Sequence, residues 1–273
     1  MDIVKRASHQ FEAVVNQVAV PVKPFLSHVG RFLLVVTFLE DALRIYMQWG
    51  DQLRYMQIYR RFPASLASLF LFYNVAAMLV GSGMAVTRTR TSIACCLLAS
   101  VVVLQSFGYG LVSNVSFMAR NVSLIGGILL LAVEGKAKQV VFAGLPMLPQ
   151  VERGTYISLL GRVLLICLFG SLVWGGDGRS RGPLQFVFLT LSLLSSIMVA
   201  VGFKARYSAL FLVAILSLFN VFVHQWWNLH PESAERDFLR YDFFQTLSII
   251  GGFLLLVDAG PGELSIDEKK KVF

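Results

Sequence analysis

Apolar segments long enough to cross a membrane follow one another along almost the whole chain. Eight candidate spans can be placed, at about 28–48, 64–86, 92–112, 121–134, 157–175, 184–203, 207–227 and 241–258. A helical span needs about 20 apolar residues, so eight of them leave only short loops in 273 residues. Only 15% of the residues are charged, against about 25% in a soluble domain. The predicted fold class is an all-α polytopic membrane protein, and an ordinary soluble enzyme is excluded.

Three of these spans depart from the usual pattern. The spans at 121–134 and 241–258 are short, and the span at 28–48 is unusually polar. A search by hydropathy would pass over all three, so five spans are the alternative count.

The N-terminal segment has one apolar face in a polar stretch. Its spacing predicts an amphipathic helix over 3–20 that lies on the membrane surface and is ended by Pro21 and Pro24. The apolar face consists of Phe11, Val14, Val15 and Val18.

The basic residues predict the orientation of the chain. With eight spans, both termini share one side of the membrane, which then carries all eight lysines and 13 of the 20 basic residues in the loops and termini. Because basic loops stay in the cytosol, both termini are predicted to be cytosolic. The net charge of +8 reflects this topology, and nucleic acid is not a predicted partner.

Motifs for catalysis or cofactor binding are missing from the sequence. It contains no P-loop, no Rossmann glycine fingerprint, no HExxH and no CxxC pair. Cys95, Cys96 and Cys167 lie in apolar runs and are interpreted as small core residues. His224 and His230 are badly spaced for a metal site. We predict no cofactor, no metal and no enzymatic activity.

Two halves of the chain resemble each other. SLIGGILLLAVEG at 123–135 and SIIGGFLLLVDAG at 248–260 are identical at eight of 13 positions with an offset of 125. GRFLLVVTF at 30–38 and GRVLLICLF at 161–169 match at an offset of 131. Four spans in each copy predict two parallel four-helix repeats. The paired glycines of both copies would let backbones approach closely where the copies meet.

This repeat divides the chain into five parts. They are a cytosolic amphipathic segment (1–26), a first repeat (27–135), a cytosolic linker (136–156), a second repeat (157–258) and a cytosolic tail (259–273).

Charged residues inside the first span point to a site. Glu40, Asp41 and Arg44 lie towards its predicted lumenal end, and the aligned positions of the second repeat are uncharged. Charges within spans are costly and usually face an interior or a cavity. The asymmetry favours a ligand site, and a buried ion-pair network is the alternative.

The two short spans also begin with polar residues. Arg120 and Asn121 precede one, and Tyr241, Asp242 and Gln245 open the other. Helices this short predict a cavity open to the lumen, floored by helix N-termini that favour an anionic group. Arg31 and Arg162 occupy equivalent positions in the two repeats, each at the predicted cytosolic end of its span. They are interpreted as arginines that snorkel to the membrane surface.

The chain ends IDEKKKVF, with Lys270 and Lys271 four and three residues from the terminus. On a cytosolic tail this pattern resembles the dilysine signal by which the COPI coat returns proteins to the endoplasmic reticulum. Val272 and Phe273 resemble a hydrophobic export signal read by COPII.

Seven stretches together resemble the surfeit locus protein 4 family, from about residue 28 to the end. They are FLEDALRIYMQW (38–49), FMARN (117–121), VFAGLP (141–146), GRVLL (161–165), VGFKAR (201–206), DFLRYDFFQTLSIIGG (237–252) and GPGELSIDEKKKVF (260–273). The resemblance implies a receptor for soluble secretory cargo that recognises short, often N-terminal, hydrophobic motifs in the lumen. It also implies loading into COPII vesicles, retrieval by COPI, and cycling between the endoplasmic reticulum, the intermediate compartment and the early Golgi.

We therefore predict a cargo pocket in which Glu40 and Asp41 attract the free amine of a cargo protein. Arg44, Arg120 and Asp242 would hold the acids in place, beside Asn121, Tyr241 and Gln245. Cargo side chains would be received by Phe38, Phe117, Phe243 and Phe244. The predicted partners are cargo, both coats and membrane lipids, and the sequence leaves open whether the chain forms a homo-oligomer.

Two rival functions fit the same sequence. Parallel repeats with charges inside the spans also suit a small-molecule transporter or a lipid scramblase. A structural organiser of endoplasmic reticulum exit sites is the other alternative.

Overall fold

The computed structural model describes residues 2–142, 159–164, 166, 183–202, 205–230 and 233–259, and within these ranges the chain is helical and contains no strand. The helices are α1 (Asp2–Met47), α2 (Trp49–Ile58), α3 (Ala64–Val86), α4 (Thr91–Gly108), α5 (Val115–Phe142), α7 (Pro183–Val201), α8 (Ala205–Val223) and α9 (Ala234–Ala259). Two 3-10 turns lie at Leu111–Ser113 and Trp226–Asn228. Residues 159–164 are also helical.

Five helical segments in the described residues are long and apolar enough to span a membrane. They are Ala64–Val86, Thr91–Gly108, Phe117–Gly135, Ala205–Asn228 and Glu235–Ala259. This confirms an all-helical polytopic membrane protein. The count of eight is not confirmed: the predicted span at 157–175 lies mostly outside the described residues, and in 184–203 the apolar part that is described is the shorter Thr190–Val201.

The five segments are not the five expected from the sequence. The helices at 121–134 and 241–258 were predicted to be short, but the structure extends them to Phe117–Gly135 and Glu235–Ala259. The prediction was wrong because it took polar residues as helix starts. Arg120 and Tyr241 instead lie inside α5 and α9, which begin at Val115 and Ala234.

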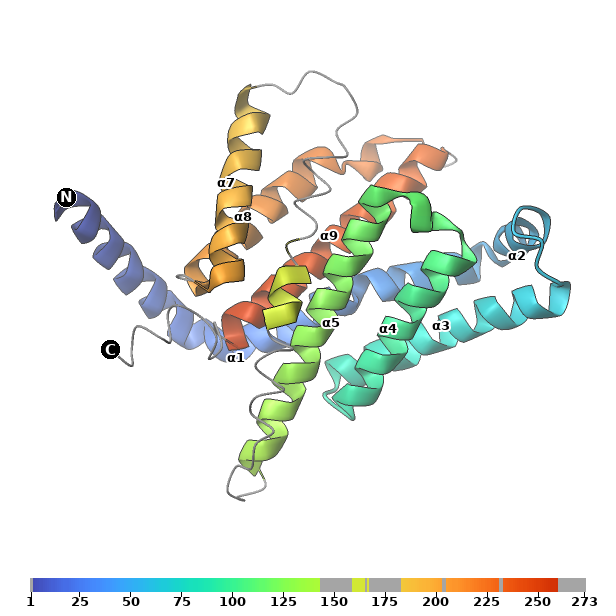
Figure 1. Cartoon of the computed structure of the whole chain (residues 1–273), viewed down its shortest axis with the longest axis horizontal. Helices are drawn as coiled ribbons and strands as arrows, with labels where there is room; N and C mark the ends of the chain where they lie inside the picture. Colours follow the sequence, from blue (N-terminus) through green and yellow to red (C-terminus); the bar gives the residue numbers. More distant parts are fainter. Residues whose placement is uncertain are drawn as a thin grey trace.

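Helix α1 does not end at the two prolines. It is continuous from Asp2 to Met47, so the predicted end at Pro21 and Pro24 is wrong. A proline removes one backbone donor and bends a helix, but the helix can continue on the other side. In Figure 1, the N-terminal part of α1 runs at an angle to the remainder.

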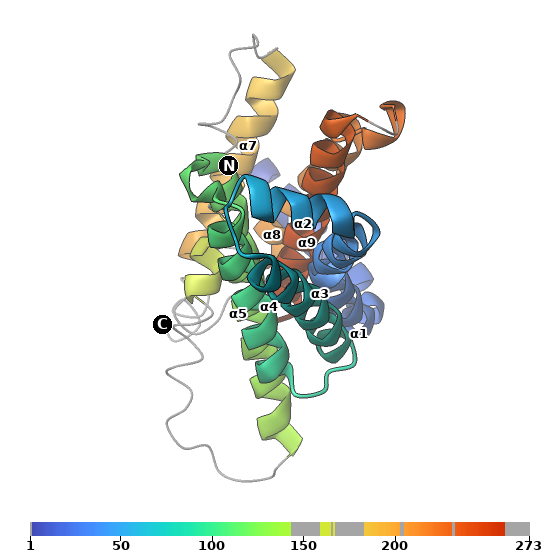
Figure 2. The same cartoon turned by 90° about the vertical axis from the view of Figure 1, so that its right-hand side faces the viewer.

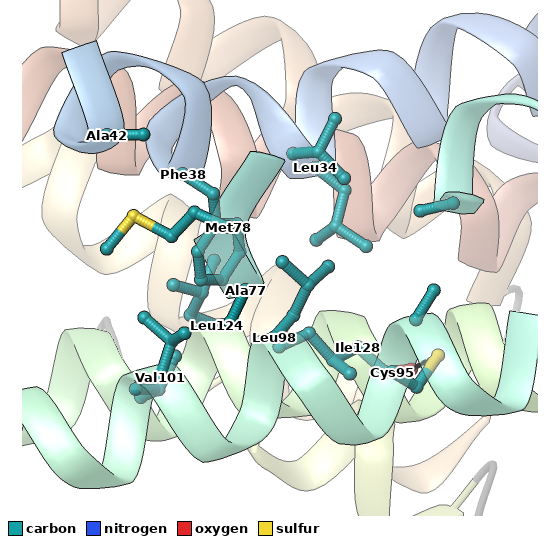
Figure 3. Close-up of a cluster of buried hydrophobic side chains, with 14 of the residues drawn as sticks. Leu34, Phe38, Ala42, Ala77, Met78, Cys95, Leu98, Val101, Leu124 and Ile128 are labelled. Carbon is teal, nitrogen blue, oxygen red and sulfur yellow. Dashed lines mark hydrogen bonds between the residues drawn. The ribbon is translucent and has the colours of Figure 1, made fainter. Parts of the chain in front are cut away.

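The helices enclose two apolar cores. One lies between α1, α3, α4 and α5, and Figure 3 shows Leu34, Met78, Leu98 and Ile128 meeting there. The other lies between α7, α8 and α9. Helix α9 packs against α1, α5 and α8 and thus joins the cores. Figure 2, viewed from the side at which α1 ends, shows the short α2 in front of the bundle.

Helices α1 and α9 cross at a pair of glycines. A Cβ atom on Gly251 would lie 2.7 Å from the carbonyl oxygen of Gly30. Ser248, one turn earlier on α9, donates a hydrogen bond to the carbonyl oxygen of Leu33 at 3.0 Å. The predicted close approach of backbones at Gly251 is confirmed, since only a residue without a side chain fits here.

The corresponding contact occurs between α5 and the helical residues 159–164. A Cβ atom on Gly161 would lie 3.0 Å from the carbonyl oxygen of Gly126 and from Leu130 Cγ. Gly30 makes the same kind of contact with Gly251 and Leu255. The Gly-Arg segment of each half, which begins at Gly30 or at Gly161, therefore contacts the helix of the other half that contains Gly251 or Gly126.

Candidate functional site: a paired acid–arginine cluster

Six charged side chains gather where α1, α5 and α9 carry their polar residues, and we call them the acid–arginine cluster. Its members are Glu40, Asp41, Arg44, Arg120, Arg240 and Asp242. Three acids face three arginines, and each acid is within ion-pair distance of one arginine. The cluster is electrically balanced as it stands.

Asp41 has both of its carboxylate oxygens occupied. Oδ1 accepts a hydrogen bond from Arg44, one turn further along α1. Oδ2 accepts a hydrogen bond from Gln105 Nε2 of α4 at 2.7 Å. Asp41 is 5% exposed, so these bonds replace the water that its charge has lost. Each Asp41 oxygen thus already accepts one hydrogen bond from the protein, which makes Asp41 less available to a ligand than an acid without such bonds.

Glu40 is equally buried and far less well satisfied. Its residue exposure is 5%, and Arg240 Nε of α9 lies 3.0 Å from its Oε1. The N–H of Arg240 is not aligned with that oxygen, and among the described residues neither Glu40 oxygen accepts a hydrogen bond. Glu40 therefore has more unused hydrogen-bonding capacity than Asp41.

A second ion pair and a row of amides join α5 to α9. Arg120 contacts Asp242. Gln245 Nε2 donates to Asn121 Oδ1 at 3.0 Å and lies 3.3 Å from the Tyr241 hydroxyl. Asn121 in turn donates to Ser106 of α4. Most of these polar groups are paired with one another, although Gln245 Oε1 accepts no hydrogen bond from a described residue. This pairing is consistent with α5 and α9 continuing through them as helices.

Aromatic rings surround the charged groups. Phe117 stacks on Tyr241 with ring centroids 6.1 Å apart, and the guanidinium of Arg44 lies 6.0 Å from the Tyr241 ring. Phe243 contacts both Phe244 and Trp227 edge to face. Phe117 and Tyr241 therefore lie beside Arg44 of the cluster, whereas the ring contacts of Phe243 are with Phe244 and Trp227.

Phe38 does not share this position. It is 3% exposed and belongs to the apolar core between α1, α3, α4 and α5. A side chain packed in this way supports α1 and is covered on all sides by protein. Lys270, Lys271, Val272 and Phe273 lie outside the described residues.

The sequence analysis missed three contributors to the site. Arg240 pairs with Glu40, Gln105 binds Asp41, and Trp226 lies under the guanidinium of Arg240 at 5.5 Å. A lone glutamine in the apolar segment at 92–112 was the available signal for Gln105. The signal for Arg240 was its place beside Tyr241 and Asp242 at the start of an apolar run.

The two arginines interpreted as snorkelling are instead buried. Arg31 is 1% exposed, binds Glu134 with Nε at 2.7 Å from Oε2, and donates to the Ala85 carbonyl oxygen. Arg162 is 0% exposed, and none of its guanidinium nitrogens has a hydrogen-bond partner in the described part of the chain. The interpretation failed because side-chain burial depends on neighbouring helices, which the residue's position within its own helix does not reveal.

An apolar groove of about 540 Å³ lies apart from the cluster, between the end of α1 and α3. It is lined by Tyr46, Trp49, Phe72, Val75, Ala76 and Leu79. A groove without a charged side chain suits a lipid acyl chain better than the charged end of a peptide.

The sequence model of the SURF4 family matches residues 5–273. The chain belongs to the SURF4 family. The resemblance found in the sequence is thereby confirmed. The relatives of this SURF4-family chain include "Surfeit locus protein 4 homolog" of Schizosaccharomyces pombe, which is 44% identical over 97% of this chain and 88% of its own length. "ER-derived vesicles protein ERV29" of Saccharomyces cerevisiae is 32% identical over 99% of this chain and 88% of its own length.

A bacterial protein matches part of this SURF4-family chain. "Inner membrane protein YphA" of Escherichia coli is 25% identical over 124 residues, which cover 41% of this chain and 87% of the bacterial protein. Nearly the whole of the smaller protein thus corresponds to less than half of the larger one. No solved structure matches the chain.

Proposed function

We propose that this chain is a transmembrane receptor that carries soluble secretory proteins out of the endoplasmic reticulum. Membership of the SURF4 family supports this function, together with the similarity to a protein named for vesicles derived from the endoplasmic reticulum. The receptor would bind short hydrophobic N-terminal motifs in the lumen, enter COPII vesicles with its cargo, and return by COPI. It would cycle through the intermediate compartment and the early Golgi.

We also propose that the receptor consists of two parallel four-helix repeats with both termini in the cytosol. The matching glycine contacts of Gly30 with Gly251 and of Gly161 with Gly126 support this arrangement. The match of a short bacterial membrane protein to less than half of the chain supports it as well. In this topology the acid–arginine cluster lies at the lumenal end of the bundle.

The proposed binding site rests on one observation: Glu40 is buried, and neither of its oxygens accepts a hydrogen bond from a described residue. A carboxylate that is buried without a hydrogen bond is costly, and it is the natural partner of a positively charged amine. The ammonium of a protein N-terminus has three donors on one compact charge. Glu40 would bind this ammonium, and the rings of Phe117, Phe243 and Phe244 would contact the first side chains of the cargo. Capture of an extended terminus is a recurring mode of peptide recognition.

The test is peptide binding to the purified protein in lipid nanodiscs. A synthetic peptide with apolar first residues and a free N-terminus should bind, and the same peptide with an acetylated N-terminus should not. Glu40→Gln should weaken binding at least about tenfold, because a charge-assisted hydrogen bond contributes about 1.5–3 kcal/mol.

Glu235→Gln is the matched control for this variant. It removes one negative charge at an exposed position of α9 and should leave binding unchanged. Equal binding of the free and acetylated peptides would exclude the amine site. Ion or lipid transport by the reconstituted protein that depends on Glu40 would instead favour a transporter or a scramblase.

A further inference from the structure

We propose that Arg240 is an exchangeable occupant of Glu40, which the ammonium of a bound peptide displaces. This inference rests on the proposed peptide-binding function. It explains how the charge of Glu40 is neutralised in the empty site and how a peptide gains access to that carboxylate.

The charge balance of the cluster requires an exchange. Every acid in it already has an arginine within ion-pair distance. A peptide amine that entered without displacing an arginine would leave one positive charge unpaired in a buried site, which is strongly unfavourable. Replacement of one monovalent cation by another keeps the number of ion pairs constant.

Arg240 is the arginine that is easiest to replace. Arg44 is held by Asp41 on its own helix, and that carboxylate is fixed further by Gln105. Arg240 reaches across from α9 to α1 and lies 3.0 Å from Glu40 without an aligned hydrogen bond. Its side chain is 29% exposed, whereas that of Glu40 is 3% exposed. The cation therefore has a path out, and the acid stays in place.

The Arg120–Asp242 pair is a poorer candidate for the same role. Both of its side chains are partly exposed, at 18% and 29%, so its carboxylate is already shared with solvent. A peptide amine would gain less there than at Glu40, because ion pairs near water are weak.

The displaced guanidinium has a place to go. It already lies 5.5 Å from the centre of the Trp226 ring, a distance at which a cation is attracted by the aromatic face. Asp237 lies three residues earlier on α9, a spacing at which a helical arginine and an acid can pair. Arg240 can thus leave Glu40 and keep a favourable contact.

The compact ammonium also suits Glu40 better than the guanidinium does. An ammonium has three donors that rotate freely, whereas Arg240 presents its single Nε–H in a fixed plane. The ammonium can donate to both Glu40 oxygens, neither of which accepts a hydrogen bond from a described residue. The gain in hydrogen bonds drives the exchange.

The experiment measures the affinity of the free-amine peptide for four nanodisc-embedded proteins: wild type, Arg240→Gln, Arg240→Lys and Arg236→Gln. Removal of the competing cation should tighten binding by about tenfold in Arg240→Gln. Arg240→Lys retains a competing cation, and because that cation is an ammonium this variant should bind the peptide no more tightly than wild type does. Arg236, whose guanidinium lies 5.4 Å from the same Trp226 ring, controls for a general loss of positive charge.

Each outcome has a defined meaning. Tighter binding in Arg240→Gln alone supports the exchange. Unchanged or weaker binding in Arg240→Gln, with binding still dependent on Glu40, overturns the exchange and leaves the peptide site standing. Equal tightening in Arg236→Gln overturns it too, since long-range repulsion would then explain the effect. If the wild type binds no peptide at all, the proposed function itself fails.

The double variant Glu40→Gln, Arg240→Gln guards against misfolding. It removes both charges of the pair and should fold, but it should bind the peptide as weakly as Glu40→Gln. Tight binding by this double variant would contradict the role of Glu40 as the acceptor.

Discussion

At the scale of single residues, two equivalent arginines in aligned GR segments have different surroundings. Arg31 is neutralised by Glu134, which also accepts a hydrogen bond from Ser27. Arg162 is as deeply buried, and in the described part of the chain its guanidinium has no acceptor. The residue aligned with Glu134 is Ala259. A counter-charge is therefore present in the first half at a position where the second half has a methyl group.

This difference predicts opposite effects of the same substitution. Arg31→Met should lower stability by about 3–5 kcal/mol, because it leaves the Glu134 charge buried without its arginine. Arg162→Met should leave stability unchanged or raise it, since it removes a buried charge. Thermal unfolding of both variants in detergent gives the comparison. A loss in Arg162→Met as large as that in Arg31→Met would reveal an anionic partner for Arg162.

For the candidate site, the sequence predicted the types of residue but not how each acid is paired. Glu40 and Asp41 are adjacent in the sequence, which gives no reason to prefer either carboxylate as the group that binds a ligand. In the structure Asp41 accepts a hydrogen bond on each oxygen, from Arg44 and from Gln105, whereas Glu40 accepts none from a described residue. The difference arises from α4 and α9, which bring a glutamine to one acid and an arginine to the other.

At the scale of elements, the crossing of α1 and α9 depends on Gly251. A methyl group there would meet the backbone of Gly30, whose carbonyl oxygen lies 2.7 Å from the added carbon. Backbone atoms cannot turn aside as a flexible side chain can. Gly251→Ala should therefore force the two helices apart and lower stability by at least about 2 kcal/mol.

Gly83→Ala is the control for that substitution. Gly83 lies within α3, is exposed, and has nothing within 4 Å of an added Cβ atom. Alanine there should be neutral or stabilise the helix by up to about 1 kcal/mol. Thermal unfolding in detergent measures both variants. Equal stability of the two would mean that the helices do not cross in close contact at Gly251.

The elements themselves were largely predictable from hydropathy. The apolar runs at 64–86, 92–112 and 207–227 correspond to α3, α4 and α8. The errors occurred at polar residues and prolines, which the sequence rules treat as ends of helices. Arg120 and Asp242 neutralise each other across the α5–α9 interface, and this pairing lets both helices continue past the expected starts.

At the scale of the whole molecule, the proposed cycling between compartments would depend on the C-terminal residues. Lys270 and Lys271 occupy the register of a dilysine signal, whereas Lys269 lies one position outside it. A double Lys270→Ser, Lys271→Ser variant should leave the endoplasmic reticulum and accumulate in the Golgi and beyond, because COPI no longer retrieves it. Fluorescence microscopy of the tagged protein, with the tag at the N-terminus, measures the distribution.

Lys269→Ser changes the tail charge by one unit without touching the signal. It should keep the normal distribution of the protein. Movement of this variant to the Golgi would show that tail charge, and not the position of the two lysines, determines retrieval.

The amino-acid sequence was enough to identify a helical membrane protein of the SURF4 family, and it indicated most of the residues of the candidate site. These properties are local, because hydropathy, helical spacing and family motifs are written in contiguous residues. Tertiary structure decided which charges meet. Glu40 and Arg240 are 200 positions apart in the sequence, and their contact depends on how deeply and at what rotation α1 and α9 pack. The Gly30–Gly251 crossing brings these two helices into close contact, and it is this packing of α9 on α1 that lets Arg240 reach Glu40.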